Sequence, residues 1–386
     1  MIYIGIDVAK DKHDCHIFDS DGVIHHDSFV FDNSRAGFNK LLEIIKSFDD
    51  KTKVGLEATG HYSENLLSFL TGNGLEVVVF NPLSVNRLRT AGTLRKTKTD
   101  KNDARYIARL LVGDSHPYSP QSYHTLQLKS LTRARFRLIK EIQPLKNRFR
   151  RLVHIVFPEL ETLFSKLDSP SILQMLAAYP SAKQIAGCDI RKLSSLLSKF
   201  SHGKIGRTKA EKLKTLAENS IGSGNSGDAL ELSLVAKRII FFDRQKDVLE
   251  AEIATIMQAL NSPITTIPGI GTVLGAVILA EIGNINSFAS DAKLLAFAGC
   301  EPSTYQSGKY TAANTPMVKH GSRYLRNALY LAANMAYLHN PVFKDYIDKK
   351  RAEGKHFYVA MSHGMKKLVR IIFAVLTKNT PYAVSN

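Results

Sequence analysis

Residues 1–12 read MIYIGIDVAKDK, and this stretch decides what kind of domain opens the chain. Residues 2–8 are rich in isoleucine and valine, which is typical of a buried β-strand, and Asp7 stands near the end of the run. Because Asp7 interrupts the only apolar run here, the stretch is not expected to be a signal peptide. The sequence therefore predicts a strand that delivers a carboxylate to one edge of a sheet.

Residues 14–111 continue with alternating strand and helix patterns. Two more strands are expected at 14–19 and 23–31, separated by the turn-like run Asp19-Ser20-Asp21-Gly22, and they predict an antiparallel meander with the first strand. The remaining expected elements are, in order, a helix at 34–48, a strand at 53–58, a helix at 61–72, a strand at 75–80 and a helix at 100–111. This is the element order of an RNase H-like α/β fold, which we predict for residues 1–120.

Residues 121–261 are predicted to form a helical linker. Residues 126–157 and 229–260 have the pattern of two long helices, which are suited to pairing as an antiparallel coiled coil. Pro144 is expected to kink the first of them. Between the two helices, residues from about 158 to 227 are interpreted as an inserted helical module whose role the sequence does not indicate.

Residues 262–386 are predicted to form a mainly α-helical C-terminal domain. Near its start, residues 266–273 read TIPGIGTV and precede an apolar helix, a pattern that resembles a helix-hairpin-helix motif. In such a motif Gly269 and Gly271 would let backbone N–H groups approach a phosphate at a helix N-terminus. A tight turn that only packs two helices together is the other open interpretation.

The chain carries a large excess of positive charge, with 52 Lys and Arg against 35 Asp and Glu and a formal net charge of +17. Such an excess usually indicates a polyanionic partner, because each neutralised phosphate releases condensed counterions. The residues predicted to contact nucleic acid lie on the first long helix and in a C-terminal patch: Arg133, Arg137, Lys140, Arg148 and Arg151, then Lys309, Lys319, Arg323 and Arg326. Ordinary solvated basic faces are the alternative for both groups.

Composition narrows the class of protein further. A hydrophobic fraction of 44% and a charged fraction of 23% exclude wholesale disorder. The three cysteines lie far apart and give neither a disulfide framework nor a metal-ligand spacing, which fits a reducing compartment. No uncharged apolar stretch of about 18 residues occurs, so no membrane partner is expected. We expect a soluble, intracellular protein that faces nucleic acid.

Four acids of the α/β domain are spaced so that they converge. Asp7 and Glu57 end two strands, and Asp100 and Asp103 fall three residues apart at the start of a helix, hence on one face. Metal-dependent chemistry at phosphodiesters commonly uses such carboxylates, because Mg²⁺ prefers hard oxygen ligands. Each acid alone has another explanation, such as a turn cap for Asp7 or a helix N-cap for Asp100. Jointly they favour a metal site.

Six motifs occur in order along the chain: IGIDVAK, GLEATGHY, KTDKNDARYIARLL, IPGIGTVLGAVILAEIG, FAGCEPSTYQSG and HGSRYLRNALY. Together they resemble the DEDD-type insertion-sequence transposases, which are RuvC-like recombinases related to the Piv DNA invertase. The motifs run from Asp7 to Tyr330, so the resemblance covers most of the chain.

The resemblance implies a DEDD tetrad of Asp7, Glu57, Asp100 and Asp103 that binds Mg²⁺, with Mn²⁺ as a substitute. It implies that Ser307, the serine before the glycine of the C-terminal motif, is the nucleophile that attacks DNA after activation by the DEDD metal across domains or subunits. The implied partners are donor and target DNA, a structured bridge RNA that pairs with both, and further copies of the chain in a homodimer or homotetramer.

Two features depart from the family pattern. Ser322 stands where many members have Asn, and the segment at about 158–227 is longer than in shorter members. From the residues alone, the Ser-Gly pair at 307–308 is more typical of a turn, and no histidine lies beside Ser307 to activate it.

Several functions remain open at this stage. The first is a transposase or recombinase with joint DEDD and serine chemistry, or a Piv-type invertase that differs from it in flanking DNA. The second is a RuvC-like structure-selective nuclease, and the third is a nucleic-acid-binding protein with degenerate carboxylates. The four intact acids, the serine motif and the net charge favour the first. In a guided system RNA pairing would carry the target sequence, which the protein sequence therefore does not reveal.

Overall fold

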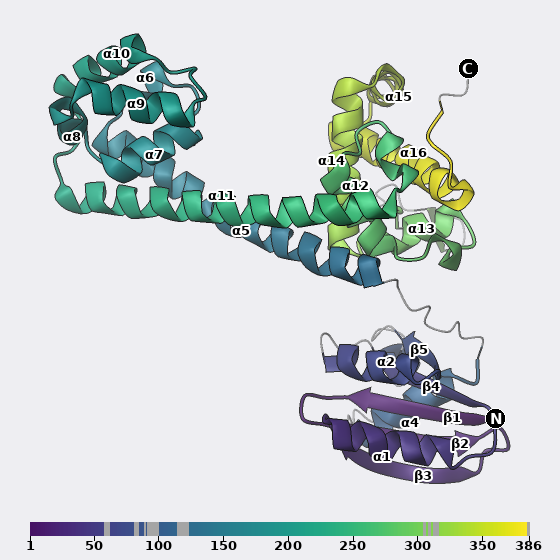
Figure 1. Ribbon diagram of the computed structural model, residues 1–386. Helices are drawn as coiled ribbons and strands as arrows, with labels where there is room; N and C mark the ends of the chain where they lie inside the picture. The colour runs from purple at the N-terminus through teal and green to yellow at the C-terminus, as the bar shows by residue number, and fades with distance from the viewer. Residues whose placement is uncertain are drawn as a thin grey trace. The chain divides into compact units, whose positions relative to one another are not determined.

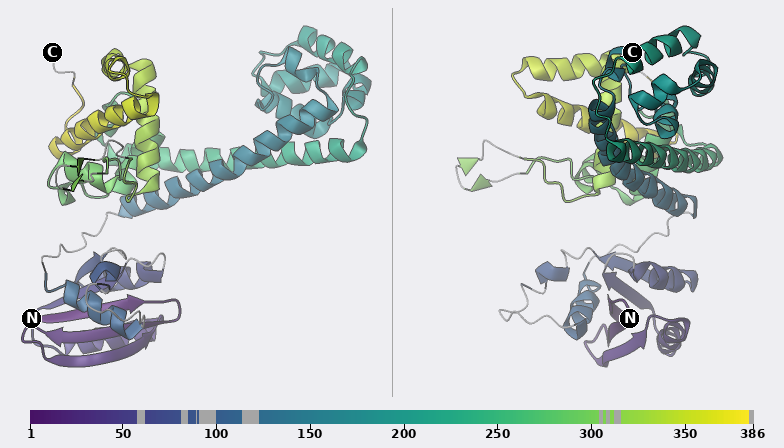
Figure 2. Two further views of the ribbon diagram at one scale, coloured as in Figure 1. Left: turned by 180° about the vertical axis from the view of Figure 1, so that it is seen from behind. Right: turned by 90° about the vertical axis from the view of Figure 1, so that its left-hand side faces the viewer.

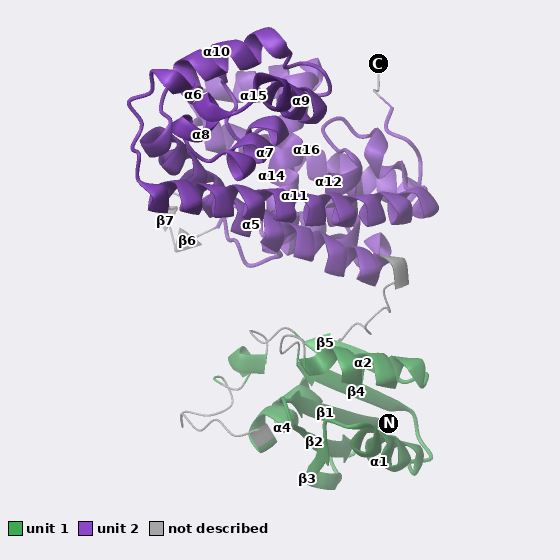
Figure 3. Ribbon diagram, turned by 60° about the vertical axis from the view of Figure 1, so that its left-hand side comes forward, with its two compact units in different colours: residues 1–120 green, residues 121–386 purple. Residues whose placement is uncertain are grey.

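The computed structural model describes residues 1–57, 62–80, 85–88, 90, 100–113, 123–303, 306–307, 310–311 and 316–383. Contacts divide the chain into two compact units, Met1–Pro120 and Gln121–Asn386, which are coloured separately in Figure 3. Among the described residues, no helix is both long enough and apolar enough to cross a membrane.

Unit 1 is built on a mixed five-stranded sheet (Figure 1). The strands are β1 (Ile2–Val8), β2 (Lys12–Asp19), β3 (Ile24–Asp32), β4 (Thr52–Glu57) and β5 (Glu76–Phe80), in the spatial order β3-β2-β1-β4-β5. The first three strands pair antiparallel, whereas β1, β4 and β5 pair parallel. With α1 (Arg35–Lys46), α2 (Tyr62–Gly72) and α4 (Asp100–Leu110), the predicted order of elements in this mixed α/β domain is confirmed.

The two faces of this sheet are covered by different helices. On one face, Ile4, Ile6 and Ile17 pack in a single buried cluster with Leu41 of α1 and Leu66 of α2. On the other face α4 packs against β1, β2 and β4. Strand β2 begins two residues before the predicted start because Lys12 and His13 continue its pairing with β3.

The contact between α4 and β1 is close enough to require glycine. A Cβ atom at Gly5 would lie 2.2 Å from the backbone oxygen of Ala104 and 2.3 Å from the backbone nitrogen of Ala108. A Cβ atom at Gly55 of β4 would lie 3.0 Å from a methyl carbon of Ile107. The backbone of α4 therefore rests directly on Gly5, and the Ile107 side chain packs on Gly55; together these contacts set the height of α4 above the sheet.

Unit 2 is mainly helical, and two long helices form its axis. In Figures 1 and 2, α5 (Tyr123–Val156) and α11 (Ser226–Leu260) lie side by side. Arg135 of α5 pairs with Glu250 and Arg148 pairs with Glu231, so the two helices run antiparallel. Helix α5 stays helical through the exposed Pro144, so the proline does not interrupt it.

Two groups of helices pack at opposite ends of this hairpin (Figure 1). The first contains α6 (Leu160–Leu163), α7 (Pro170–Ala178), α8 (Ala182–Gly187), α9 (Ile190–Phe200) and α10 (Arg207–Glu218). The second contains α12 (Thr272–Ile282), α13 (Asp291–Phe297), α14 (Arg323–His339), α15 (Pro341–Ala352) and α16 (Phe357–Lys378), with the short helices η1 (Pro263–Thr266) and η2 (Ile285–Ser287). Each group has its own buried apolar cluster. The short strands β6 (Gln306–Ser307) and β7 (Tyr310–Thr311) pair antiparallel.

Substitution at Gly5 tests the contact between α4 and the sheet. Gly5→Ala is expected to lower the free energy of unfolding by about 2 to 3 kcal/mol, because the added methyl group would overlap the α4 backbone. Chemical denaturation followed by circular dichroism measures the change. Gly72→Ala is the matched control, because a Cβ atom there meets nothing within 4 Å. If both substitutions lower the free energy of unfolding equally, the contact between Gly5 and the α4 backbone is not the cause.

Candidate active site

Two strand-end acids of unit 1 lie on neighbouring parallel strands. Ile6 of β1 and Leu56 of β4 are register partners, and Asp7 and Glu57 follow them directly. Side chains alternate between the faces of a strand, so Asp7 and Glu57 share the face of Gly5 and Gly55, which is the face covered by α4. Both acids are half-buried. The two carboxylates therefore leave adjacent strands on the side where α4 lies.

The other two predicted acids lie on α4. Asp103 is 4% exposed, and it precedes Ala104, which rests on Gly5. Asp100 is the first residue of the helix, and its side chain lies outside the described part of the structure. Spacing of three residues puts Asp100 and Asp103 on the same helix face.

The donor set fits a hard divalent cation by its chemistry, since all four groups are carboxylates. Among the side chains that the structure describes, however, no three of the His, Cys, Asp and Glu type lie close enough to form a metal centre. Asp7, Glu57 and Asp103 thus do not form such a centre by themselves.

Two further acids near these residues were not singled out from the sequence. Asp14 of β2 is the register partner of Asp7 and accepts a hydrogen bond from Ser28 Oγ at 3.4 Å. Asp27 of β3 binds Lys101 and Arg105 of α4. Hydrogen bonds from Lys101 and then from Arg105 lower the pKa of Asp27 to about 2. Strand alternation could have indicated Asp14, but only the packing of α4 reveals Asp27.

The serine of the C-terminal motif lies in the other unit. Ser307 is the last residue of β6, and its side chain is not among those described. Lys309 falls outside the described residues. The residue predicted to be the nucleophile thus belongs to the antiparallel pair of strands β6 and β7 in unit 2.

A buried acid of unit 2 organises part of the predicted basic surface. The Glu281 side chain of α12 is 2% exposed, and it accepts hydrogen bonds from Arg133 Nε at 2.7 Å and Arg133 Nη2 at 3.0 Å. Ser322, the N-cap of α14, donates to Glu281 Oε2 at 2.7 Å, and Tyr324 lies under the Arg133 guanidinium. Arg133 and Ser322 therefore join α5, α12 and α14 within the protein.

The electrostatics of Glu281 follow from this arrangement. Burial raises its pKa, but the hydrogen bonds from Arg133 and Ser322 outweigh burial, so the net pKa is below the ordinary value of 4.5. Glu281 is therefore ionised in the folded protein, as a partner for Arg133. No sequence pattern singled it out, because the residue stands alone among apolar neighbours in LAEIG.

The other predicted basic residues differ in their surroundings. Arg137, Lys140, Arg151, Lys319 and Arg323 are exposed. Arg148 is paired with Glu231 of α11, and Arg326 donates from Nη1 to the Ala298 carbonyl oxygen at 3.2 Å. Exposure makes these five residues accessible to a phosphate. Two of them also contact aromatic side chains of unit 2, since Arg323 donates to Tyr324 Oη at 3.0 Å and Lys140 lies over the Phe136 ring.

The two glycines of the TIPGIGTV segment have different environments. Gly269 has a φ of +83°, and a Cβ atom there would lie 2.3 Å from the Ala332 oxygen of α14. Gly271 is the N-cap of α12, is exposed, and has nothing within 4 Å of such an atom. Glycine is therefore required at 269 for backbone geometry and for the packing of α14, whereas Gly271 leaves an open helix N-terminus.

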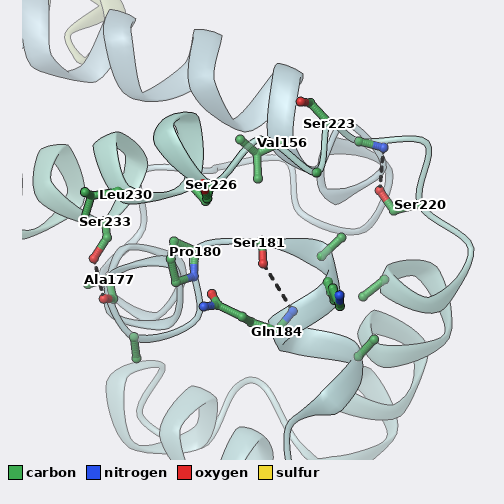
Figure 4. A pocket seen from close by; sticks show the side chains of 18 of the residues that line it. Val156, Ala177, Pro180, Ser181, Gln184, Ser220, Ser223, Ser226, Leu230 and Ser233 are labelled. Carbon is green, nitrogen blue, oxygen red and sulfur yellow. Dashed lines mark hydrogen bonds between the residues drawn. The ribbon is translucent and has the colours of Figure 1, made fainter.

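A cavity of about 880 Å³ lies at the far end of the hairpin, away from these residues. Figure 4 shows its lining, in which the Ser181 hydroxyl accepts a hydrogen bond from the Gln184 backbone and Ser233 donates to the Ala177 carbonyl oxygen. Among the described residues that line it, Glu218 is the only acid. The described lining therefore offers no pair of carboxylates of the kind that metal-dependent phosphodiester chemistry commonly uses.

Comparison with protein families gives the class of this protein. A model of the DEDD type, described as a transposase of the IS110 group, matches residues 4–158. A second model, described as the transposase IS116/IS110/IS902 family, matches residues 261–348. Together they match more than half of the chain, and the protein is a DNA recombinase of the transposase class. It belongs to the IS110-type family of DEDD transposases.

Individual relatives extend along nearly the whole chain. The insertion element IS116 uncharacterized 44.8 kDa protein of Streptomyces clavuligerus is 27% identical, covering 97% of this chain and 94% of the relative. The pilin gene-inverting protein of Moraxella bovis is 24% identical over 98% and 97%. Because these matches leave only a few per cent of the chain uncovered, both relatives extend through most of residues 158–227.

Among solved structures, RuvC of T. thermophilus in complex with a Holliday junction substrate matches 31% of this chain and 99% of its own, with 16% identity and a TM-score of 0.24. A score this low does not establish a shared fold.

Removal of the Glu281 charge tests its role. Glu281→Gln is expected to lower the free energy of unfolding by about 2 kcal/mol near neutral pH, since the change leaves Arg133 without its anionic partner. The folded-state pKa is lowered, so the contribution is fully present above the ordinary value of 4.5 and is lost as pH falls through the folded-state value. Urea denaturation of both proteins between pH 3 and pH 8 measures the difference.

Glu250→Gln serves as the control in that series. It removes a more exposed partner of Arg135 and is expected to cost less than about 1 kcal/mol. If Glu281→Gln lowers the free energy of unfolding no more than Glu250→Gln does, the Glu281–Arg133 ion pair is not a major contributor to stability.

Proposed function

We propose that this transposase cuts and exchanges the DNA strands of an insertion sequence by using a RuvC-like domain with a Mg²⁺-binding DEDD site. The observation that carries the proposal is the position of Asp7 and Glu57 at the ends of adjacent parallel strands, on the face covered by the helix that carries Asp100 and Asp103. Asp100 would have to complete the ligand set, since the described carboxylates do not form a centre by themselves.

A divalent ion bound there would polarise the scissile phosphate and stabilise the charge that develops on its oxygens. The protein would contribute the geometry: the strands hold Asp7 and Glu57, and α4 supplies Asp100 and Asp103. Mg²⁺ is the expected ion and Mn²⁺ a substitute, because both accept oxygen ligands.

The second part of the proposal is a serine nucleophile on unit 2. The Ser307 hydroxyl would attack the phosphorus of a DNA phosphodiester and form a phosphoserine ester, while one backbone P–O bond breaks. The proton lost by the serine hydroxyl would balance the one taken up by the released deoxyribose oxygen. Lys309, Lys319, Arg323 and Arg326 would neutralise the charge on the phosphate. The support is the family membership together with the position of Ser307 on the β6–β7 hairpin. Arg326 also holds the Ala298 carbonyl, so its guanidinium is already oriented within the protein.

The third part concerns nucleic-acid partners. We propose donor and target DNA and a structured bridge RNA as ligands of the basic surfaces, supported by the net charge of +17 and by the exposure of Arg137, Lys140 and Arg151 on α5. The open N-terminus of α12 at Gly271 is a phosphate contact in this proposal, as in a helix-hairpin-helix motif.

We also propose a homodimer or homotetramer that associates through α11 in coiled-coil fashion. Support comes from exposed apolar residues on the outer side of this helix: Leu230, Leu234, Phe241 and Val248. The last three are spaced by seven residues, the repeat of a coiled-coil seam. Shallow grooves beside Phe241 and Val248 would accept side chains of a second copy.

Junction PCR in cells that carry the gene with its native flanks tests the proposed chemistry. Asp7→Asn and Ser307→Ala are each expected to reduce recombination junctions at least about 1,000-fold relative to wild type, because each removes a group of the chemical step. Asp32→Asn, an exposed acid of β3, is the control and should leave junctions unchanged. Circle junctions would indicate transposition and inversion junctions a Piv-type invertase.

The outcomes separate the alternatives. If junctions persist with Ser307→Ala and vanish with Asp7→Asn, Ser307 is only a turn residue. All of the chemistry would then depend on the carboxylates. Metal-dependent nicking without any junctions would instead favour the structure-selective nuclease.

Light scattering coupled to size exclusion tests the association surface. Phe241→Glu with Val248→Glu is expected to shift the full-length protein from dimer or tetramer to monomer, because charges would be buried at the seam. Ile221→Glu is the control, since Ile221 is 87% exposed but lies outside α11. An unchanged mass for the double variant would place the interface elsewhere.

A further inference from the structure

Asp27 of β3 contacts the helix that carries two of the four proposed ligands. Its Oδ2 accepts a hydrogen bond from Lys101 Nζ at 2.7 Å, and its Oδ1 accepts from Arg105 Nε at 3.0 Å and also from Arg105 Nη2. Lys101 and Arg105 alternate with Asp100 and Asp103 along the first turns of α4. A side chain of the sheet therefore holds the same helical turns that present the acids.

A β-bulge directs Asp27 toward α4. Between the register pairs Cys15–Phe29 and Ile17–His26, one residue of β2, His16, lies opposite two residues of β3, Asp27 and Ser28, so β3 has an extra residue at this point. Bulges change the direction of a side chain and are common near active sites. The buried His16 adds a second restraint, since its Nδ1 lies 3.0 Å from the Asp27 carbonyl oxygen.

The contact acts on the rotation of α4 about its own axis. A helix turns by about 100° per residue, so Arg105 lies about 160° around the axis from Asp103. Gly5 and Gly55 set how high the helix lies above the sheet, as their contacts with Ala104 and Ile107 show. Asp27 binds side chains on the side of α4 opposite Asp103. These contacts restrict rotation of the helix about its axis, and this fixes the direction in which the Asp103 side chain points.

The ion pairs themselves contribute little to global stability, because Asp27, Lys101 and Arg105 are all about 36% to 45% exposed. A partly exposed pair that adds little stability still restricts side-chain orientation. Loss of these ion pairs is therefore expected to change the orientation of the proposed ligands on α4 rather than the melting temperature of the protein.

We propose that Asp27 is a positioning residue for the carboxylate site: by holding Lys101 and Arg105 it orients α4 so that Asp100 and Asp103 face Asp7 and Glu57. This inference rests on the proposed function of the four acids. Asp27 itself would contact neither the metal nor DNA. The site would depend on the edge strand β3 through the contacts of Asp27 with α4.

Metal titration of the full-length protein tests the proposal. Mn²⁺ alone is added to wild type, Asp27→Asn and Asp27→Glu, and binding is followed by electron paramagnetic resonance of the free ion. Asp27→Asn is expected to weaken Mn²⁺ binding about 10-fold, the usual effect of losing an outer support of a metal site, with the melting temperature within about 2 °C of wild type. Asp27→Glu keeps the charge and is expected to restore most of the affinity.

Amide hydrogen exchange gives a readout that needs no metal. In Asp27→Asn, residues 100–105 are expected to exchange about five-fold faster, while residues 107–111 on the glycine contact stay unchanged. The variant pair Lys101→Gln and Arg105→Gln should reproduce both effects from the helix side, which keeps the test valid if Asp27→Asn folds poorly. Asp32→Asn on the same strand is the control and should behave as wild type.

Asp7→Asn separates this inference from the proposed function. If Asp7→Asn leaves Mn²⁺ binding intact, the metal site itself is wrong. If Asp7→Asn abolishes binding but Asp27→Asn leaves both affinity and exchange at the wild-type level, the site stands and the positioning role of Asp27 is overturned. A loss of affinity that Asp27→Glu does not restore would likewise contradict a role based on charge.

Discussion

The packing of α4 on Gly5 is the contact on which unit 1 depends most directly. Helix backbone meets strand backbone there, with no room for a side chain on β1. The spacing has a chemical consequence, because the strand that passes under α4 continues for two residues to Asp7. A larger residue at position 5 would lift the helix and increase the separation between the acids of α4 and those of the strands. Packing and candidate chemistry are therefore coupled through one glycine.

Unit 2 uses a different device to join elements that are distant in sequence. Its core clusters are apolar, but Glu281 of α12 is buried at the place where α5 and the start of α14 meet. A buried ion pair of this kind is rarely the most stabilising solution, because desolvation offsets much of the attraction. It does define geometry, since the bidentate contact with Arg133 and the hydroxyl of Ser322 admit few arrangements. The helix that begins at Ser322 carries Arg323 and Arg326, so the buried acid also orients part of the basic C-terminal patch.

The positive charge of unit 2 comes from two kinds of residue: cations paired with acids inside the unit, and cations exposed on its surface. Arg133, Arg135 and Arg148 neutralise acids of the same unit, and their contribution is to hold α5 against α11 and α12. The cations that remain exposed on α5, such as Arg137 and Arg151, are the ones available to a polyanion. Membership of the IS110-type transposases makes DNA the natural polyanion, and the separation of structural from exposed cations indicates which substitutions would alter DNA binding without altering the fold.

The sequence by itself determined the order of elements in unit 1, the two long helices of unit 2 and the family, because hydrophobic periodicity and local motifs are properties of neighbouring residues. It also indicated Asp7 and Glu57, since a strand end can be recognised from the residues around it. Only the tertiary structure revealed Asp27 and Glu281 as partners of Lys101, Arg105 and Arg133, and the reason for glycine at position 5. These features are contacts between residues 74 to 148 positions apart, or about 100 for Gly5 and α4, and no local pattern encodes which distant side chain a residue will meet.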